Sequence, residues 1–258
     1  MISLRIHVDS MLEELREHVL RKPDVYAFIL LDLERYRHVT EFIIAEREGV
    51  IEGFVVMFRG GVLMSVIIDG THEAVEFLVE KFSKMLRKPA IINVPREYED
   101  KVLKVLKNVV AVYSVDVMSV RKGEERLIIK HPYREVVEGD YKQLANLLGE
   151  RRARRVIASY RPVFGIFVNS QLVSTAATLV KLKEVWMLGA VYTHPEYRNR
   201  GFATSVCSAW LKHAFENTNI ATLWVRSDNL PAKRVYEKLG FKTVRVNSWI
   251  CVEVDKKP

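Results

Sequence analysis

The stretch that decides the fold is GAVYTHPEYRNRGFA, residues 189–203. An apolar run over residues 185–193 predicts a strand, and the polar residues 194–200 predict a loop. A helix is predicted to follow over residues 201–217. The stretch therefore predicts a strand, a loop and a helix in direct succession.

A loop of this kind indicates an anion site. A helix that begins directly after a strand and loop directs several backbone N–H groups, and the positive end of its dipole, toward one point. Gly201 and Ala203 let an anion approach the backbone closely, and Arg198 and Arg200 add positive charge. Taken alone, these residues fit an ordinary strand-to-helix connection equally well.

A second informative segment is SDNLPAKRVYEKLGF, residues 227–241. It follows a buried strand predicted over residues 221–225, and it contains a helix predicted over residues 230–239 that a glycine ends. Asn229 and Tyr236 stand seven positions apart in it. The two segments together place polar groups on consecutive strand-to-helix connections.

The first segment resembles the acetyl-coenzyme A signature of the GCN5-related N-acetyltransferases (GNAT), and the second resembles a later motif of the same superfamily. Two motifs in the right order and spacing make this resemblance specific, and it covers roughly residues 127–258. The residues of the two motifs most resemble those of the branch that includes FR47-like and glycine N-acyltransferase-like proteins. Those proteins also place a degenerate half before the catalytic half.

The resemblance implies an N-acyltransferase that moves an acetyl or short acyl group from acetyl-coenzyme A to an amine. The transfer would proceed by direct attack in a ternary complex, without a metal. Strand backbone groups would bind the pantetheine arm and polarise the thioester carbonyl, and the loop would cradle the pyrophosphate. The implied cofactor-binding residues are Val191, Tyr192, Thr193, Arg198, Asn199, Arg200, Gly201, Phe202, Ala203, Thr204 and Asn229.

Tyr236 is the residue that the resemblance implies as catalytic, because it would protonate the departing thiolate. A phenol suits that step, since its ordinary pKa of about 10 keeps the proton in place until charge develops on sulfur. Without the two motifs, a helical tyrosine packed against the sheet would be the simpler interpretation.

The base that takes the acceptor's proton stays open at this point. An amine with an ordinary pKa of about 10 must lose a proton before it attacks. Two kinds of relatives place a glutamate on a nearby strand, but this sequence has Trp224 at one position and Glu184 out of register with the other. His194 belongs to a His-Pro dipeptide that is common in such turns, which favours a structural role, and Tyr192 is a further alternative.

The acceptor is expected to be a small-molecule amine or an amino acid rather than a protein amine. Arg151, Arg152, Arg154 and Arg155 lie where the resemblance places the acceptor-side helices. They favour either a carboxylate-bearing acceptor or a solvated charged face.

Two other interpretations come from different classes of protein. One is a non-catalytic sensor or regulatory module that binds acetyl-coenzyme A. The other is a nucleic-acid-binding protein, which the formal net charge of +8 would suit. The sequence lacks the interleaved aromatic and basic residues of the common RNA modules, so we expect no nucleic-acid partner.

The remaining pattern predicts two mixed α/β halves in tandem. In the C-terminal half, strands or helices are predicted over residues 127–130, 138–148, 162–168, 172–180 and 243–254. In the N-terminal half they are predicted over residues 41–46, 50–58, 62–68, 71–87, 90–94, 98–106 and 109–120, the last as a strand pair. The strand before Thr71 leads almost directly into a helix, so this half lacks the phosphate loop.

We therefore predict an α/β fold with mixed sheets, built from tandem GNAT-like domains. Residues 1–125 form the degenerate copy and residues 126–258 form the copy that binds the cofactor. No run of about 18 apolar residues and no secretory signal is present, which favours a cytoplasmic protein without a membrane partner. The two cysteines, Cys207 and Cys251, fit core positions rather than a metal or disulfide site.

Overall fold

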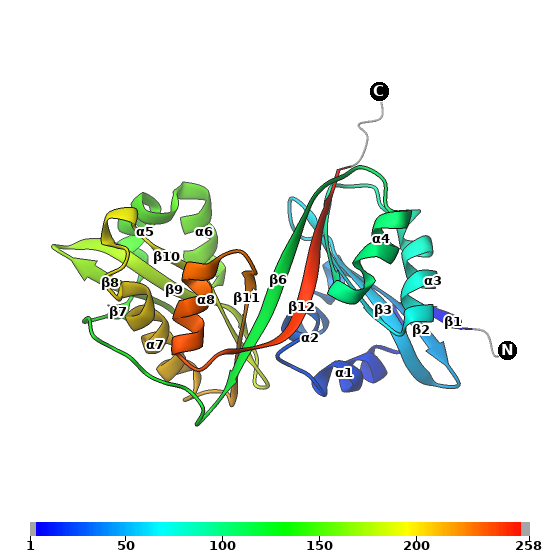
Figure 1. The fold of residues 1–258 in the computed structure, drawn as a ribbon, viewed down its shortest axis with the longest axis horizontal. Helices are drawn as coiled ribbons and strands as arrows, with labels where there is room; N and C mark the ends of the chain where they lie inside the picture. The colour runs from blue at the N-terminus through cyan, green and yellow to red at the C-terminus, as the bar shows by residue number, and fades with distance from the viewer. Residues whose placement is uncertain (1–3, 254–258) are drawn as a thin grey trace. The chain divides into compact units, whose positions relative to one another are not determined.

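The structure, a computed structural model, describes residues 4–253 and contains one order of elements twice (Figure 1). The first set is β1 Arg5–Val8, α1 Leu12–Leu20, α2 Ala27–Arg35, β2 Thr40–Arg47, β3 Val50–Phe58, β4 Met64–Gly70, α3 His72–Ser83, β5 Ala90–Pro95, α4 Glu99–Val105 and β6 Val109–Arg121. The second set is β7 Arg134–Glu135, α5 Tyr141–Leu148, α6 Glu150–Ser159, β8 Val163–Val168, β9 Gln171–Lys181, β10 Trp186–Thr193, α7 Phe202–Ala214, β11 Ile220–Arg226, α8 Leu230–Lys238 and β12 Lys242–Val252. The match between the two sets confirms the predicted tandem fold.

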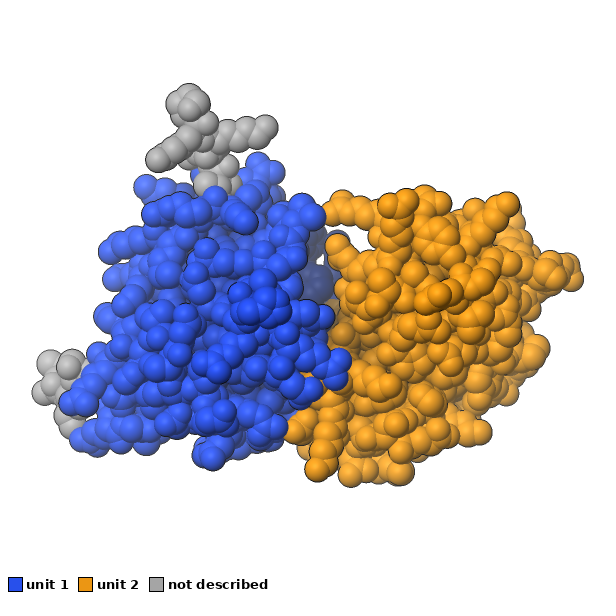
Figure 2. Space-filling model, turned by 180° about the vertical axis from the view of Figure 1, so that it is seen from behind, with its two compact units in different colours: residues 1–116, 226–228, 245–258 blue, residues 117–225, 229–244 orange. Residues whose placement is uncertain are grey.

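Contacts divide the chain into two compact units, which Figure 2 shows in different colours. Unit 1 runs to Asp116 and also contains Arg226–Asp228 and the chain from Arg245 onward. Unit 2 consists of Val117–Val225 and Asn229–Val244. This division differs from the single boundary predicted between residues 125 and 126, because β6 and β12 each contribute residues to both units.

Unit 1 is built on a sheet with the strand order β1-β2-β3-β4-β5-β12-β6. Its β12 portion is antiparallel to β5, with Asn247 opposite Pro95 and Val252 opposite Ala90. The core between this sheet and α3 includes Val75, Leu78 and Phe82 from the helix, as its 3.6-residue periodicity predicts. The final strand of the chain thus forms an interior strand of the N-terminal unit.

The connection from β4 to α3 in unit 1 consists of the single residue Thr71. Gly70 ends β4, Thr71 caps the helix through a hydrogen bond from the Ala74 N–H at 3.4 Å, and α3 begins at once. The φ angle of Gly70 is 146°, and a Cβ there would lie 2.4 Å from the carbonyl oxygen of Glu52. Only glycine fits this close approach of β4 to β3.

Unit 2 is built on a sheet with the strand order β6-β11-β10-β9-β8-β7. Helices α7 and α8 share one hydrophobic cluster with the strands, which includes Val206, Trp210 and Tyr236. Helices α5 and α6 belong to a separate cluster, which includes Leu144 and Val156. Figure 1 shows α7 and α8 in front of the strands of this unit. The sheet is therefore covered by a different helix pair on each face.

Several sequence predictions were wrong in detail. Residues 127–130 do not form a strand, because the N–H groups of Ile128 and Lys130 donate to the Ser208 and Ser205 hydroxyls of α7, both at 3.0 Å. The predicted strand pair over residues 109–120 is the single strand β6. The predicted final strand reached residue 254, which lies outside the described residues, whereas β12 ends at Val252. The helices α1 and α2 were not predicted, and the basic segment that includes Arg151 belongs to α6.

Candidate functional site

The site begins where two parallel strands of unit 2 separate. β10 and β11 are paired only through Trp186 with Ala221 and Met187 with Thr222. On its other side, β10 has a register shift against β9 between Gly189 and Tyr192. The two residues inside this bulge, at positions 190 and 191, have no partner in either pairing. A bulge beside a separating strand leaves backbone groups free to bind a ligand.

The bulge is held by side chains of β9. Ala190 has a φ angle of 47°, which is uncommon for a residue other than glycine, and its carbonyl oxygen accepts a hydrogen bond from the Thr175 hydroxyl at 3.1 Å. Regular pairing resumes at Tyr192, and the hydroxyls of Ser174 and Thr193 lie 2.8 Å apart. These contacts fix the backbone of Val191 in the opening between the strands.

The loop after β10 has the backbone geometry of an anion site. Asn199 and Gly201 have positive φ angles of 61° and 82°, and Gly201 is the N-cap of α7 without any side-chain cap. The first turn of α7 begins with Phe202, so its N–H groups have no acceptor one turn earlier in the helix. An anion placed against this turn would receive these hydrogen bonds and the favourable field of the helix.

Two arginines extend from the loop into solvent. The Arg198 Nε donates to the carbonyl oxygen of Thr193 at 3.3 Å, and its guanidinium lies 5.9 Å from the centre of the Tyr192 ring. The Arg200 guanidinium lies 5.5 Å from the Tyr197 ring centre. Both side chains remain exposed, so their charges are free to attract an anion to the loop.

His131 is a site residue that the sequence analysis missed. Its Nε2 lies 2.8 Å from the carbonyl oxygen of Arg200, and its ring stacks on Phe202 with the centroids 4.2 Å apart. It is also the nearest group that a Cβ on Gly201 would meet, at 3.7 Å. His131 lies on a segment without regular structure 69 positions before Arg200, so no local sequence pattern indicates the contact.

Tyr236 is buried in the cluster beneath α7 and α8, with 7% of its surface exposed. Its ring packs edge-on against Phe241 at a centroid distance of 6.0 Å. Burial raises the pKa of Tyr236 far above its ordinary value, and the Cys207 thiol raises it further. The phenol therefore keeps its proton at neutral pH and can act as a proton donor.

Asn229 begins the helix that carries Tyr236. Its Oδ1 accepts the Ala232 N–H at 3.3 Å, so the side chain caps α8. Capping uses the carbonyl oxygen of the amide and leaves its NH2 group for another partner. Whether that group binds a cofactor stays a prediction.

A family model described as FR47-like protein matches residues 163–250. This span contains the bulge of β10, the loop after it and Tyr236.

Residues 163–250 thus match the FR47-like family, and the C-terminal unit has the fold of a GNAT domain.

Solved structures agree with a tandem GNAT fold for the whole chain. A Drosophila protein from a structural genomics consortium is 16% identical, with a TM-score of 0.69 over 96% of this chain and 98% of that chain. The GCN5-related N-acetyltransferase from Sphaerobacter thermophilus is 13% identical, with a TM-score of 0.64 over 100% and 98%. A tandem GNAT protein from the clavulanic acid biosynthesis pathway is 11% identical, with a TM-score of 0.60 over 99% and 100%. Identities this low show likeness of fold, and no curated protein matches the sequence.

Two classes of feature are absent from residues 4–253, the part of the chain that the structure describes. No group of three or more His, Cys, Asp or Glu side chains is placed to hold a metal ion in that range. None of the helices described there is long and apolar enough to cross a membrane.

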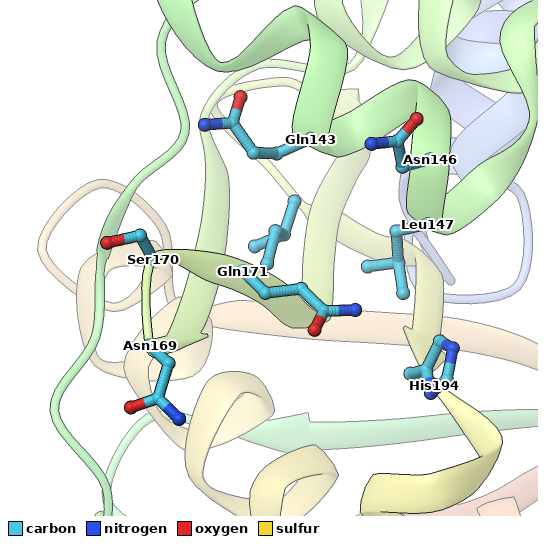
Figure 3. Close-up of a pocket in the computed structure, with 8 residues that line it drawn as sticks. Gln143, Asn146, Leu147, Asn169, Ser170, Gln171 and His194 are labelled. Atoms are coloured by element: carbon cyan, nitrogen blue, oxygen red, sulfur yellow. The ribbon is translucent and has the colours of Figure 1, made fainter.

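Unit 2 has a polar hollow of about 300 Å³ beside α5 (Figure 3). Gln143 and Asn146 line it from α5, Gln171 lines it from the start of β9, and His194 lines it from the end of β10. The His194 Nδ1 is buried and has no hydrogen-bond partner. A purely structural role in the turn therefore does not explain why the Nδ1 of His194 is buried without a hydrogen bond.

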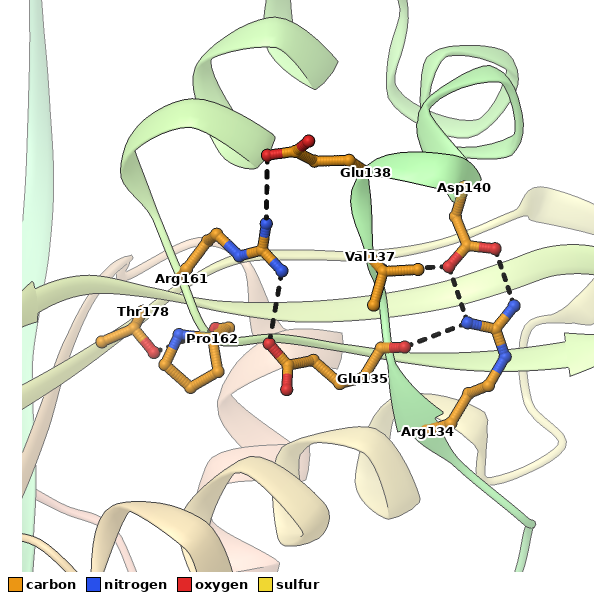
Figure 4. A network of polar contacts seen from close by, with 8 residues as sticks. All are labelled: Arg134, Glu135, Val137, Glu138, Asp140, Arg161, Pro162 and Thr178. Atoms are coloured by element: carbon orange, nitrogen blue, oxygen red, sulfur yellow. Dashed lines mark hydrogen bonds and ion pairs between the residues drawn. The ribbon is translucent and has the colours of Figure 1, made fainter.

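An ion-pair network fixes the start of α5 (Figure 4). Arg134 binds both carboxylate oxygens of Asp140, at 2.6 and 2.7 Å, and the Val137 N–H donates to the same carboxylate at 3.0 Å. The hydrogen bonds from Arg134 lower the pKa of Asp140. Arg161 lies 3.6 Å from Glu135 and 3.8 Å from Glu138. These contacts hold the segment before α5 and thereby one wall of the hollow.

The α6 arginines lie on the exposed side of their helix. Arg151, Arg152 and Arg155 line a second hollow of about 400 Å³, while Ala153 and Val156 form the buried side of α6. The fourth arginine, Arg154, donates to the Tyr141 hydroxyl at 3.2 Å. A role for these side chains in acceptor binding stays a prediction.

The other base candidates differ in position. Glu184 precedes β10 at the end opposite the loop, about 20 Å of extended strand before Val191. Tyr192 lies with α5 and α6, under the Arg198 guanidinium. Glu184 thus lies far from the bulge along β10, whereas Tyr192 directly follows it and stays an alternative.

Proposed function

We propose that the protein is an N-acyltransferase that moves an acetyl or short acyl group from acetyl-coenzyme A to an amine. The observation that supports this most is the separation of β10 from β11 directly before an uncapped helix that begins at Gly201. The opening suits the narrow pantetheine arm, and the loop suits the pyrophosphate. Arg198 and Arg200 would add favourable charge at the rim.

In this mechanism the backbone N–H of Val191 donates to the thioester carbonyl oxygen and stabilises the negative charge that develops there. The amine nitrogen attacks the carbonyl carbon, so a C–N bond forms and the C–S bond breaks. The electron pair of the C–S bond goes to sulfur, which takes the Tyr236 proton. The nitrogen loses its proton to solvent water, and water returns a proton to Tyr236 at the end of the cycle. Burial raises the pKa of Tyr236, so the phenol carries its proton before the reaction and does not serve as the base for the amine.

We further propose that the acceptor is a small-molecule amine or an amino acid. The support is the exposed arginine face of α6, where Arg151, Arg152 and Arg155 line one hollow together. A carboxylate on the acceptor would neutralise part of that charge through paired hydrogen bonds. The cofactor is a substrate in this scheme, and no metal takes part.

Calorimetric titration with acetyl-coenzyme A tests the cofactor site. Gly201→Glu puts a negative side chain into the loop and should abolish micromolar binding. Gly123→Glu is the matched control, because Gly123 has a comparable positive φ of 94° and open space around its Cβ position. No binding by the unaltered protein would overturn the proposal. Tight binding without acetylation of any amine in a broad panel would instead favour a non-catalytic sensor.

A further inference from the structure

The bulge of β10 has a backbone conformation that its own residues do not favour. Between Gly189 and Tyr192, the two residues of the bulge lie opposite a single residue of β9. Ala190, the first of the two, has a φ angle of 47°, in the left-handed region that a Cβ makes unfavourable. Such a backbone persists only where the surrounding contacts hold it.

Two residues of β9 hold the bulge. Gly189 lies so close to Leu179 that a Cβ would come within 2.2 Å of the leucine Cδ1, which fixes where the strand enters the bulge. Thr175, with 0% of its surface exposed, then donates its hydroxyl proton to the carbonyl oxygen of Ala190 at 3.1 Å. The hydroxyl thus takes the place of the backbone N–H that a regular ladder would provide.

The hydrogen bond to Ala190 also sets the direction of the next N–H group. The carbonyl of Ala190 and the N–H of Val191 belong to one planar trans peptide unit, in which they point in opposite directions. Since the carbonyl oxygen points to Thr175 on β9, the N–H points away from β9, toward the side of β10 on which β11 lies. There the pairing of β10 with β11 is limited to Trp186 and Met187, so the N–H faces the opening between the strands.

The same hydrogen bond strengthens this N–H as a donor. A carbonyl that accepts a hydrogen bond polarises its peptide unit, and hydrogen bonds in series reinforce one another, most of all where water is excluded. The Thr175 hydroxyl is buried and meets that condition. An N–H that is aimed and polarised before the substrate arrives stabilises charge on an oxygen without reorganisation during the reaction.

We propose that Thr175 is a positioning residue of the transferase, whose hydroxyl aims and polarises the Val191 N–H toward the thioester oxygen. Thr175 acts through the peptide unit between Ala190 and Val191 rather than on the reacting atoms. The inference rests on the proposed function, because the thioester carbonyl is assigned to Val191 there. A threonine that only satisfied a buried carbonyl would leave the thioester unaffected.

The infrared carbonyl band of bound acetyl-coenzyme A, isotope-labelled at the acetyl carbonyl carbon, tests this role without an acceptor amine. A hydrogen bond from the Val191 N–H weakens the thioester C=O bond and lowers the frequency of the band. Thr175→Val keeps the shape of the side chain but removes the hydroxyl, so it should move the band to higher frequency. Thr175→Ser keeps the hydroxyl and should leave the band in place. Thr175→Ala replaces the valine variant if that variant does not fold.

Thr178→Val is the matched control. Thr178 also lies on β9, is 2% exposed, and donates its hydroxyl proton to the Pro162 carbonyl at 3.1 Å. Its removal should lower the melting temperature but leave the carbonyl band unchanged. If Thr178→Val moves the band as far as Thr175→Val does, the cause is a loosened β9 and the proposal is overturned.

Steady-state kinetics with an amine that the protein acetylates give a second measurement. Thr175→Val should lower kcat by roughly 10–100-fold, somewhat less than the complete loss of an oxyanion donor. The dissociation constant for acetyl-coenzyme A should change by no more than about fivefold, the worth of one neutral hydrogen bond. A weaker cofactor affinity with an unchanged kcat would contradict the positioning role.

The two proposals fail in distinguishable ways. If acetyl-coenzyme A does not bind the unaltered protein, the proposed function fails. If the cofactor binds and its carbonyl band is the same in Thr175→Val as in the unaltered protein, only the positioning role fails.

Discussion

The Nε2 of His131 lies 2.8 Å from the carbonyl oxygen of Arg200. Since its ring also stacks on Phe202, one side chain contacts the loop on both sides of Gly201. A residue outside both motif segments, 189–203 and 227–241, therefore contacts the loop.

The first prediction concerns this contact. His131→Ala removes the hydrogen bond and the stacking, and it should weaken binding of acetyl-coenzyme A by roughly 3–10-fold. His131→Phe keeps an aromatic ring on Phe202 and should have a smaller effect. Calorimetry measures both, with the exposed His38→Ala as the control. Unchanged affinity in His131→Ala would show that the loop keeps its shape without this support.

The second prediction concerns Tyr236. Tyr236→Phe should lower turnover by about 10²–10³-fold, the range of general acid catalysis, and leave the affinity for acetyl-coenzyme A within about twofold. Because the pKa of Tyr236 is raised, ionisation of this phenol should cause no loss of rate up to about pH 10. Steady-state rates from pH 6 to pH 10 test both points. Tyr36→Phe in unit 1 serves as the control, and unchanged turnover would remove Tyr236 from the mechanism.

The third prediction concerns a buried carboxyl group on α2. Asp32 is 7% exposed, and burial raises its pKa to about 7. Its folded pKa lies above its unfolded value, so the folded state is favoured below about pH 4 and loses stability as pH rises through 7. Asp32→Asn should therefore raise the unfolding midpoint of unit 1 at pH 8 and change it little at pH 4. Calorimetric scans check this, with the exposed Asp100→Asn as the control. Equal shifts at both pH values would contradict it.

The fourth prediction concerns a buried ion pair in unit 1. The Nη1 of Arg245, on β12, lies 2.6 Å from the Oδ2 of Asp69, on β4, and the Tyr26 hydroxyl donates to the same oxygen at 2.6 Å. Arg245→Met leaves the Asp69 charge buried without its cation and should cost roughly 3–5 kcal/mol of stability. Adding Asp69→Asn should recover part of that loss. Denaturant unfolding measures both variants, and a double variant less stable than Arg245→Met would argue against an uncompensated charge.

Local sequence patterns predicted the parts of the fold that local physics decides. The β8–β9 hairpin, the cap at Thr71 and the succession of β10, loop and α7 depend on neighbouring residues, and the structure contains all of them. The positions of the GNAT motifs on strand ends and helix starts followed from the same patterns. Glycine at position 201 was informative because its positive φ is a backbone requirement.

The remaining parts depend on contacts between distant residues. The residues around Ala190 do not indicate its positive φ, because Thr175 on the neighbouring strand β9 holds the bulge. Residues 127–130 have a strand-like composition, yet hydroxyls from α7 take their N–H groups. The unpartnered nitrogen of His194 becomes visible only once α5 and the β8–β9 turn are placed around it.

The placement of β12 in unit 1 constrains the order of events during synthesis. β12 lies between β5 and β6 in that sheet, so the N-terminal unit lacks an interior strand until residues 245–252 leave the ribosome. Until then β5 and β6 each have one edge whose backbone groups are not paired with a neighbouring strand. The N-terminal unit thus completes its sheet only after the whole of unit 2 has been synthesised, and a truncated chain that stops before β12 lacks an interior strand of unit 1.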